Sequence, residues 1–373
     1  MVLRPVPLLP VDAEWCLDTF GRLPVTHAVT LLGPGASDDE WLEARRTRIG
    51  ASELAGIAGM PGAYGSWYAS WFAKVEGWVT EATMAMRIGH LLEPVIANIA
   101  LEEKPWLGRL VRPGARLLGH PDMPWLCCTP DYLAIVEPVD DCILPMRGTA
   151  TPCCQRQLGG SHQLDCPDRG CAEHGEPTAV PVECKSDEGG QEWGPDMSRQ
   201  APLKYIAQNL IQADVLGASY GWLAHLAGKH FSLHLVDPAE HQDWYREIVE
   251  VGERFMLDLT AGCEPTLEDI DGSTATLQAL LRRFPDTTDA EEDHIRKAFL
   301  PGDLATQFRS SRRLLAEAKE YKQLIDNRVR HVLGHAVEGL APDGSTVVRR
   351  SIYPRRAYRV GESTVDQLSV VNR

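Results

Sequence analysis

A short apolar run that ends in an acid and a lysine constrains this chain most. Residues 179–182 are apolar and lead into Glu183-Cys184-Lys185. This pattern predicts a β-strand over residues 179–184. Side chains two residues apart lie on one face of a strand, so Glu183 and Lys185 are expected to point the same way. A carboxylate beside an ammonium at a strand end can hold Mg²⁺ and orient a water or a phosphate. Such triplets are also common as exposed ion pairs, so the rest of the sequence must decide between the two.

Length and charge set the frame for that decision. A chain of 373 residues is long enough for one large core and an appendage. The net charge of −15 divides into −22 before residue 296 and +7 from there on. An acidic body with a basic tail suits an enzyme that gathers acids around metal ions and touches nucleic acid through basic patches. A solvated acidic surface explains much of the same count.

Apolar spacing and turn signals predict a mixed α/β domain. This domain is expected over 39–265, after an extension over 1–38 and before a mainly helical accessory region over 276–373. Its helices are expected at 39–45, from 51, and at 91–101, 202–216 and 239–260. Asp38 and Asp39 are expected to cap the first of these helices, and Ser52 the second. Its strands are expected at 126–136, 179–184, 222–226 and 230–236, the last two forming a hairpin around Gly228-Lys229. Cys127, Cys128 and Cys184 lie in these apolar runs and are expected to be small core residues. The accessory region is expected to hold helices at 276–284 and 303–333 and a strand at 346–353.

Pro130-Asp131 and Glu183-x-Lys185 together form the PD-(D/E)xK nuclease pattern. Hydrolysis of a phosphodiester near neutral pH is helped by a metal that activates water and neutralises the developing charge. Asp131 and Glu183 at neighbouring strand ends could share Mg²⁺, with the backbone carbonyl of Cys184 between them. Lys185 could then hold the attacking water. The pattern predicts a restriction-endonuclease-like core, a mixed central sheet flanked by helices.

Further motifs in series resemble the phage lambda exonuclease family, the YqaJ-type viral recombinases. The resemblance covers about residues 39–262, and the motifs occur in the family's order. They are Trp41-Leu42-x-x-Arg45, Ile49-Gly50-Ala51-Ser52, Gly89-His90-Leu91-Leu92-Glu93-Pro94, His120-Pro121-x-x-Pro124-Trp125-Leu126, and the helix with Tyr205, Gln208 and Gln212.

This resemblance implies roles for residues around the metal site. Glu93 matches the helix-borne acid that completes it, although an exposed helix acid would look the same. His90, on the same helix face, resembles a histidine that some related nucleases add as a ligand; capping or core packing would also explain it. Gln208 and Gln212 match two of the family's glutamines and would contact the scissile strand or buttress the acids. An exposed polar helix face is the alternative for this pair.

The resemblance also implies a site for a terminal 5′-phosphate. Arg45, Ser52 and Thr129 match the positions that cradle it, and Thr129 keeps the hydroxyl of the usual serine. A guanidinium and hydroxyls suit a phosphate. No residue after Glu183-x-Lys185 clearly matches the family's second phosphate-binding arginine, so end recognition rests on fewer residues than cleavage does.

An insertion over about 138–178 separates the two strands that carry Asp131 and Glu183. It holds few large apolar groups and cannot pack a core of its own. Its soft ligands suffice for one structural tetrahedral Zn²⁺, whereas a mobile loop with incidental thiols is the alternative. The candidate ligands are Cys153, Cys154, Cys166, Cys171 and His174.

The resemblance thus implies a Mg²⁺-dependent exonuclease with two ions, for which Mn²⁺ could substitute. It would degrade linear double-stranded DNA from 5′ to 3′ and leave 3′ single strands for an annealing protein, in the cytoplasm of a bacterial cell or phage-infected host. DNA ends, that annealing protein and a homotrimeric ring are the expected partners, and no membrane is. A non-catalytic DNA-binding recombination adaptor and an endonuclease with the same chemistry are the alternatives.

Overall fold

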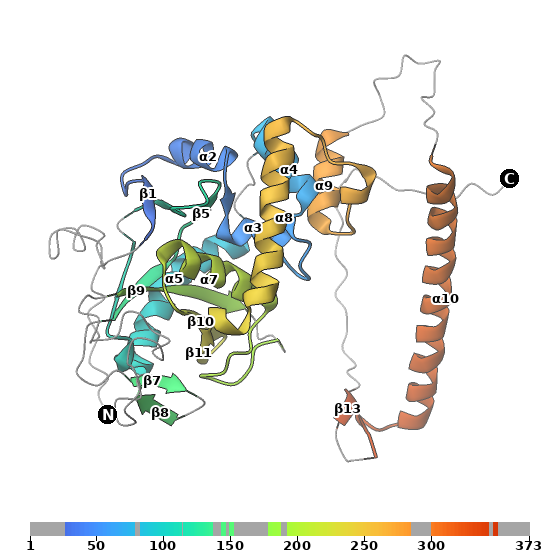
Figure 1. Ribbon diagram of the computed structural model, residues 1–373. Coiled ribbons are helices and arrows are strands. Elements are labelled where there is room, and N and C mark those ends of the chain that lie inside the picture. Colours follow the sequence, from blue (N-terminus) through green and yellow to red (C-terminus); the bar gives the residue numbers. More distant parts are fainter. Residues whose placement is uncertain are drawn as a thin grey trace. The chain divides into compact units, whose positions relative to one another are not determined.

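The structure, a computed structural model, describes most of the chain (Figure 1). Its described residues up to 284 belong to one compact unit, and those from 300 onward belong to a second. The described ranges are 27–78, 83–113, 115–136, 143–146, 149–152, 178–187, 192–284, 300–342 and 346–349.

A five-stranded mixed sheet forms the centre of the first unit, as the sequence predicts. β9 and β10 run parallel, and the other neighbouring strands run antiparallel. The predicted hairpin around Gly228-Lys229 is confirmed, with Gly228 in the left-handed conformation (φ 58°). In spatial order the strands are β11 (His230–Val236), β10 (Gly221–Ala227), β9 (Thr178–Asp187), β6 (Tyr132–Val136) and β3 (Arg109–Val111).

The single strand predicted over 126–136 is wrong, because two strands cover it. Thr129-Pro130-Asp131 separates β5 (Leu126–Cys128) from β6, and β5 joins a different sheet. Pro130 lacks the backbone N–H that a continuous ladder needs. The break places Asp131 immediately before β6, which pairs antiparallel with β9.

The second sheet has four strands and lies in the same unit. β2 and β5 run parallel, while the other pairs run antiparallel. The spatial order is β1 (Val29–Leu32), β4 (Leu117–Gly119), β5 and β2 (Ile49–Gly50).

The helices of the first unit follow the apolar spacing, with shifted ends. Ser37 caps α2 with its side chain, where the sequence suggested Asp38 or Asp39. α5 begins earlier than predicted, so that Pro94 lies well inside it. The helices are α2 (Asp38–Arg46), α3 (Ala51–Ile57), α4 (Trp67–Glu76), α5 (Met84–Glu103), α7 (Leu203–Leu216), α8 (Gln242–Ala261) and α9 (Thr274–Arg283), with short 3₁₀ helices η1 (Pro105–Leu107), η3 (Pro238–Glu240) and η4 (Leu267–Asp269).

The core lies where α7 joins the two sheets. α7 contacts β9 and β10 of the five-stranded sheet, β5 of the four-stranded sheet, and α3. Cys127, Cys128 and Cys184 are buried, as expected of small core residues. By length and composition alone α5 could also cross a membrane, and it contacts β9 and β10. Because both helices contact β9, polar side chains on α7 and α5 lie near this strand.

α9 packs within the first unit, although the predicted accessory region begins at 276. Its Thr276 hydroxyl donates to Ser66 Oγ at 2.8 Å, and its Arg283 guanidinium lies 4.0 Å from the ring centre of Phe72. The second unit holds α10 (Gly302–Leu333), β12 (Glu338–Leu340) and β13 (Thr346–Arg349). A hairpin of β7 (Ile143–Met146) and β8 (Thr149–Pro152) is the described part of the insertion between β6 and β9.

Candidate active site

Glu183 and Lys185 lie in contact on one face of β9. Lys185 Nζ donates to Glu183 Oε1 at 2.7 Å, as their spacing on a strand predicts. Asp131 lies at the start of the neighbouring strand, where its Oδ2 accepts a hydrogen bond from the Cys184 backbone N–H at 2.8 Å. The backbone carbonyl of Cys184 was expected to be a metal ligand, and that role stays a prediction.

The three predicted acids influence one another electrostatically. Burial raises the pKa of Asp131 well above its usual value, and the negative charges of Glu183 and Glu93 raise it further. Burial lowers the pKa of Lys185, but Glu183 and Asp131 outweigh that effect, so the pKa of this lysine is raised. The two acids therefore favour the protonated form of Lys185.

The two glutamines of α7 also hold the Glu183 carboxylate. Gln208 Nε2 donates to Glu183 Oε1 at 2.5 Å, and Gln212 Nε2 donates to Oε2 at 2.6 Å. All three side chains are buried, with exposed fractions of 8%, 0% and 3% for Gln208, Gln212 and Glu183. An exposed polar helix face is therefore the wrong interpretation of the glutamines, and they buttress an acid.

Glu93 reaches the cluster from α5 and pairs with His90. His90 Nδ1 lies 2.6 Å from Glu93 Oε1, and the side chains are 73% and 19% exposed respectively. Core packing is thus the wrong interpretation of His90, because most of its side chain is exposed. Its role as a metal ligand stays a prediction.

The donor set fits a hard divalent cation by its chemistry. Glu93, Asp131 and Glu183 supply carboxylate oxygens, which are the ligands that Mg²⁺ prefers. In the described part of the chain, however, no three His, Cys, Asp or Glu side chains are grouped closely enough to hold a metal ion. Both Glu183 oxygens accept hydrogen bonds, from Lys185 and Gln208 and from Gln212. The metal site stays a prediction.

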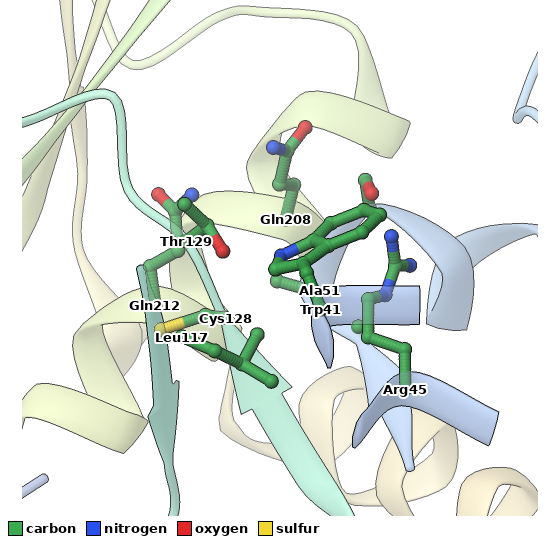
Figure 2. Close-up of a pocket in the computed structure, with 10 residues that line it drawn as sticks. Trp41, Arg45, Ala51, Leu117, Cys128, Thr129, Gln208 and Gln212 are labelled. Atoms are coloured by element: carbon green, nitrogen blue, oxygen red, sulfur yellow. The ribbon is translucent and has the colours of Figure 1, made fainter. Parts of the chain in front are cut away.

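A pocket beside this cluster brings together the residues predicted to bind a 5′-phosphate (Figure 2). Its volume of about 60 Å³ is sufficient for a small anion. Gln208 and Gln212 form part of its wall, so the pocket and the Glu183 carboxylate share two side chains. The lining residues are Trp41, Arg45, Gly50, Ala51, Ser52, Leu117, Cys128, Thr129, Gln208 and Gln212.

Arg45 is oriented in this pocket from two sides. Its guanidinium lies 4.5 Å from the ring centre of Trp41 and 3.4 Å from a carboxylate oxygen of Glu53. Glu53 is shared with Lys74, whose Nζ lies 3.0 Å away. A Cβ at Gly50 would lie 2.6 Å from Arg45 Nη2, so glycine is what lets the guanidinium lie there.

The two hydroxyl residues of the pocket differ in their contacts. Thr129 Oγ1 donates its hydrogen to the Arg116 carbonyl at 3.0 Å, so this hydroxyl must rotate before it can donate to an anion. Ser52 lies exposed in the first turn of α3. It is not the helix cap suggested by the sequence, because Gly50 occupies that position.

Part of the chain is similar to a known protein family. Residues 40–219 match the model of the YqaJ-like viral recombinase domain. This stretch of the chain carries a YqaJ-like viral recombinase domain. The predicted resemblance is confirmed, and it supports a nuclease with a role in recombination.

Two solved structures also align with the chain. An alkaline exonuclease, LHK-Exo from Laribacter hongkongensis, is 16% identical over 60% of this chain and 93% of its own, with a TM-score of 0.37. LHK-Exo in complex with dAMP is 14% identical over 66% and 98%, with a TM-score of 0.37. No curated protein matches.

The YqaJ-like domain holds site residues that sequence reasoning missed. Asn209 is fully buried and donates to Gln212 Oε1 at 3.4 Å and to the Trp222 carbonyl at 3.2 Å, which fixes the second glutamine. Arg112 interacts electrostatically with Glu93 and Asp131. Three amides within the otherwise apolar run 206–212 were the available signal for Asn209, because buried polar groups require partners.

The zinc prediction lies outside the part of the YqaJ-like domain that the structure describes. The five candidate ligands are Cys153, Cys154, Cys166, Cys171 and His174. The zinc site therefore stays a prediction.

Proposed function

We propose that this protein is a Mg²⁺-dependent exonuclease that degrades linear double-stranded DNA from its 5′ ends. One observation carries the proposal: Gln208 and Gln212 line the anion-sized pocket and also hold the Glu183 carboxylate. A terminal phosphate bound beside Arg45 would bring the first phosphodiester bond of that strand to the acid cluster. Cleavage next to an end-binding pocket is the geometry of an exonuclease.

Glu93, Asp131 and Glu183 are the residues that would hold Mg²⁺, with Mn²⁺ as a substitute and two ions as the proposed number. When bound, such ions lower the pKa of water and neutralise the charge that develops on the phosphate. Lys185, held protonated by two acids, orients the attacking water or a phosphate oxygen. Gln208 and Gln212 keep Glu183 in place.

Family resemblance extends the proposal to the product and partners. Resection from 5′ ends leaves 3′ single strands, which an annealing protein would then pair in recombination. A trimeric ring around the duplex would keep the enzyme on its substrate. These events would take place in the cytoplasm of the bacterial or phage-infected cell, without a membrane partner.

A digestion assay tests the function. Linear duplex with a 5′-phosphate, linear duplex without it, and circular duplex are incubated with the protein in Mg²⁺ or in chelator. Rapid loss of the phosphorylated linear duplex, in Mg²⁺ alone, is expected. Cleavage of the circular duplex would indicate an endonuclease, and binding without any cleavage would indicate an adaptor.

Variants connect the assay to the site. Lys185→Ala and Glu183→Gln should abolish cleavage, since each removes a charged group of the cluster. Arg45→Gln should remove the preference for a 5′-phosphate while leaving slower cleavage. Lys229→Ala, on the exposed turn between β10 and β11, is the matched control and should cleave like the wild type.

A further inference from the structure

Two tyrosines and a lysine form a surface beside Lys185 that the proposed chemistry does not use. Lys204 Nζ lies 4.3 Å from the ring centre of Tyr64 and 4.8 Å from that of Tyr205. The two tyrosine hydroxyls are 3.2 Å apart, close enough for a hydrogen bond. Tyr205 also lies against the site itself, because Lys185 Nζ is 4.8 Å from its ring centre.

Tyr205 is held rigidly by a stack of rings. Trp193 lies parallel to it at 5.7 Å and stacks on His225 at 3.9 Å with an interplanar angle of 8°. Trp193 Nε1 donates to Asp187 Oδ2 at 2.8 Å, and His225 Nε2 lies 2.9 Å from Asp187 Oδ1. Asp187 follows Lys185 by two residues on β9, so this stack continues the face that carries the catalytic lysine.

The backbone of Tyr64 is also held in place, but its side chain is accessible to solvent. It lies in the loop between α3 and α4, and its backbone carbonyl packs against α3 at Gly56, where a Cβ would come within 2.2 Å of the oxygen. Only glycine permits that approach, so the loop is seated closely on α3. The tyrosine itself is 66% exposed. An aromatic side chain with a fixed backbone and an open surface is suited to stacking on a nucleobase.

Lys204 provides a cation next to the exposed ring. In the part of the chain that the structure describes, no carboxylate lies within ion-pair distance of its ammonium. Its neighbours are the two tyrosines, whose ring faces attract a cation without neutralising it. Because no carboxylate among these described residues neutralises its charge, the Lys204 ammonium is suited to bind a phosphate of DNA that lies in the site.

We propose that Tyr64, Lys204 and Tyr205 form a nucleotide-binding surface that holds the DNA strand on the 3′ side of the scissile bond. The spacing of residues along α7 supports this placement of the DNA strand. Gln212, Gln208 and Tyr205 occupy successive turns of the helix, about 5 Å apart. The first two line the terminal-phosphate pocket, and the third meets Lys185 beyond it. Tyr64 would stack on a base and Lys204 would bind its phosphate. This inference rests on the proposed exonuclease function.

The test removes the two stacking partners separately and together. Fluorescence anisotropy in chelator measures binding of 5′-phosphorylated duplexes that lack one base, at each of the first four nucleotides in turn. Tyr64→Ala should weaken binding of intact DNA by about 5- to 100-fold. At one nucleotide on the 3′ side of the scissile bond, removing the base should weaken binding by the wild type but not by Tyr64→Ala. Tyr64→Phe, which keeps the ring, should bind nearly as well as the wild type.

Lys204→Ala should bind less tightly and should reduce the slope of log affinity against log salt by about one. Lys229→Ala is the control for loss of a lysine and should keep the wild-type slope. Equal sensitivity of wild type and Tyr64→Ala at all four nucleotides, together with a wild-type slope for Lys204→Ala, would overturn the inference. Wild-type protein that neither binds nor cleaves DNA would instead overturn the proposed function.

Discussion

Two acids of the same cluster are expected to respond oppositely to loss of their charge. Glu183→Gln should destabilise the metal-free protein, whereas Asp131→Asn should leave its stability unchanged or raise it. The reason is the difference in their hydrogen bonds. Glu183 accepts from three side chains at 2.5–2.7 Å, while Asp131 accepts one backbone N–H.

The size of the effect at Glu183 follows from those contacts. A glutamine at 183 can still accept from Lys185 and Gln208, but without charge assistance, and its amide nitrogen would face the Gln212 amide. Gln212 could turn its oxygen inward only by giving up its bond from Asn209. Hydrogen bonds to charged groups contribute about 1.5–3 kcal/mol each, so the loss should be about 2–4 kcal/mol. For a unit of this size, that corresponds to a fall in Tm of roughly 3–7 °C.

Asp131→Asn keeps a carbonyl oxygen for the Cys184 N–H and removes one of three mutually repelling charges. Burial and the two neighbouring acids raise the pKa of Asp131, which shows that the fold disfavours its ionised form. Removing that charge should therefore cost no stability.

Thermal unfolding in chelator at pH 8, followed by circular dichroism, compares both variants with the wild type. Chelator is needed because a bound ion would stabilise the wild type by mass action. A Glu183→Gln protein that melts at or above the wild-type temperature, or an Asp131→Asn protein that melts clearly below it, would refute this account of the cluster.

Three further predictions concern the rest of the molecule. Gly221→Ala should lower the free energy of unfolding in urea by about 1–3 kcal/mol, since its Cβ would lie 1.9 Å from Oδ1 of buried Asn209; unchanged stability would contradict that packing. Burial, helped by His225, lowers the pKa of His234 to about 4, below the unfolded value near 6.5. Between pH 4 and 6.5 the unfolded chain therefore binds a proton that the folded chain does not, so the free energy of unfolding should fall as pH drops from 6.5 to 4. The fall should be smaller in His234→Gln, and equal pH profiles of the two proteins in urea titrations would show that His234 is not responsible. Elemental analysis should find about one zinc per chain if the cysteine-rich insertion binds it, and a value far below one would exclude that site.

Local patterns in the sequence determined much of the framework. The two-residue period of a strand predicted that Glu183 and Lys185 share a face of β9, and the turn at Gly228 predicted the hairpin that follows. Gly217, at φ 72°, ends α7 at the predicted residue. These features depend on the backbone geometry of a few neighbouring residues. The pattern of apolar, polar and glycine residues follows that local geometry, so it can be read from the sequence. The motifs in series also predicted the resemblance to the YqaJ-type viral recombinases, which the match over residues 40–219 confirms.

Tertiary structure alone decided which partners those side chains meet. Glu183 faces both glutamines of α7, and Tyr64 meets Tyr205 across 141 residues of sequence. Pro130 divides a predicted strand between two sheets, which is how Asp131 comes to lie beside β9. Such contacts depend on how whole helices and strands pack together. Packing results from the combined burial of many apolar side chains, and their spacing in the sequence does not indicate which element each will contact.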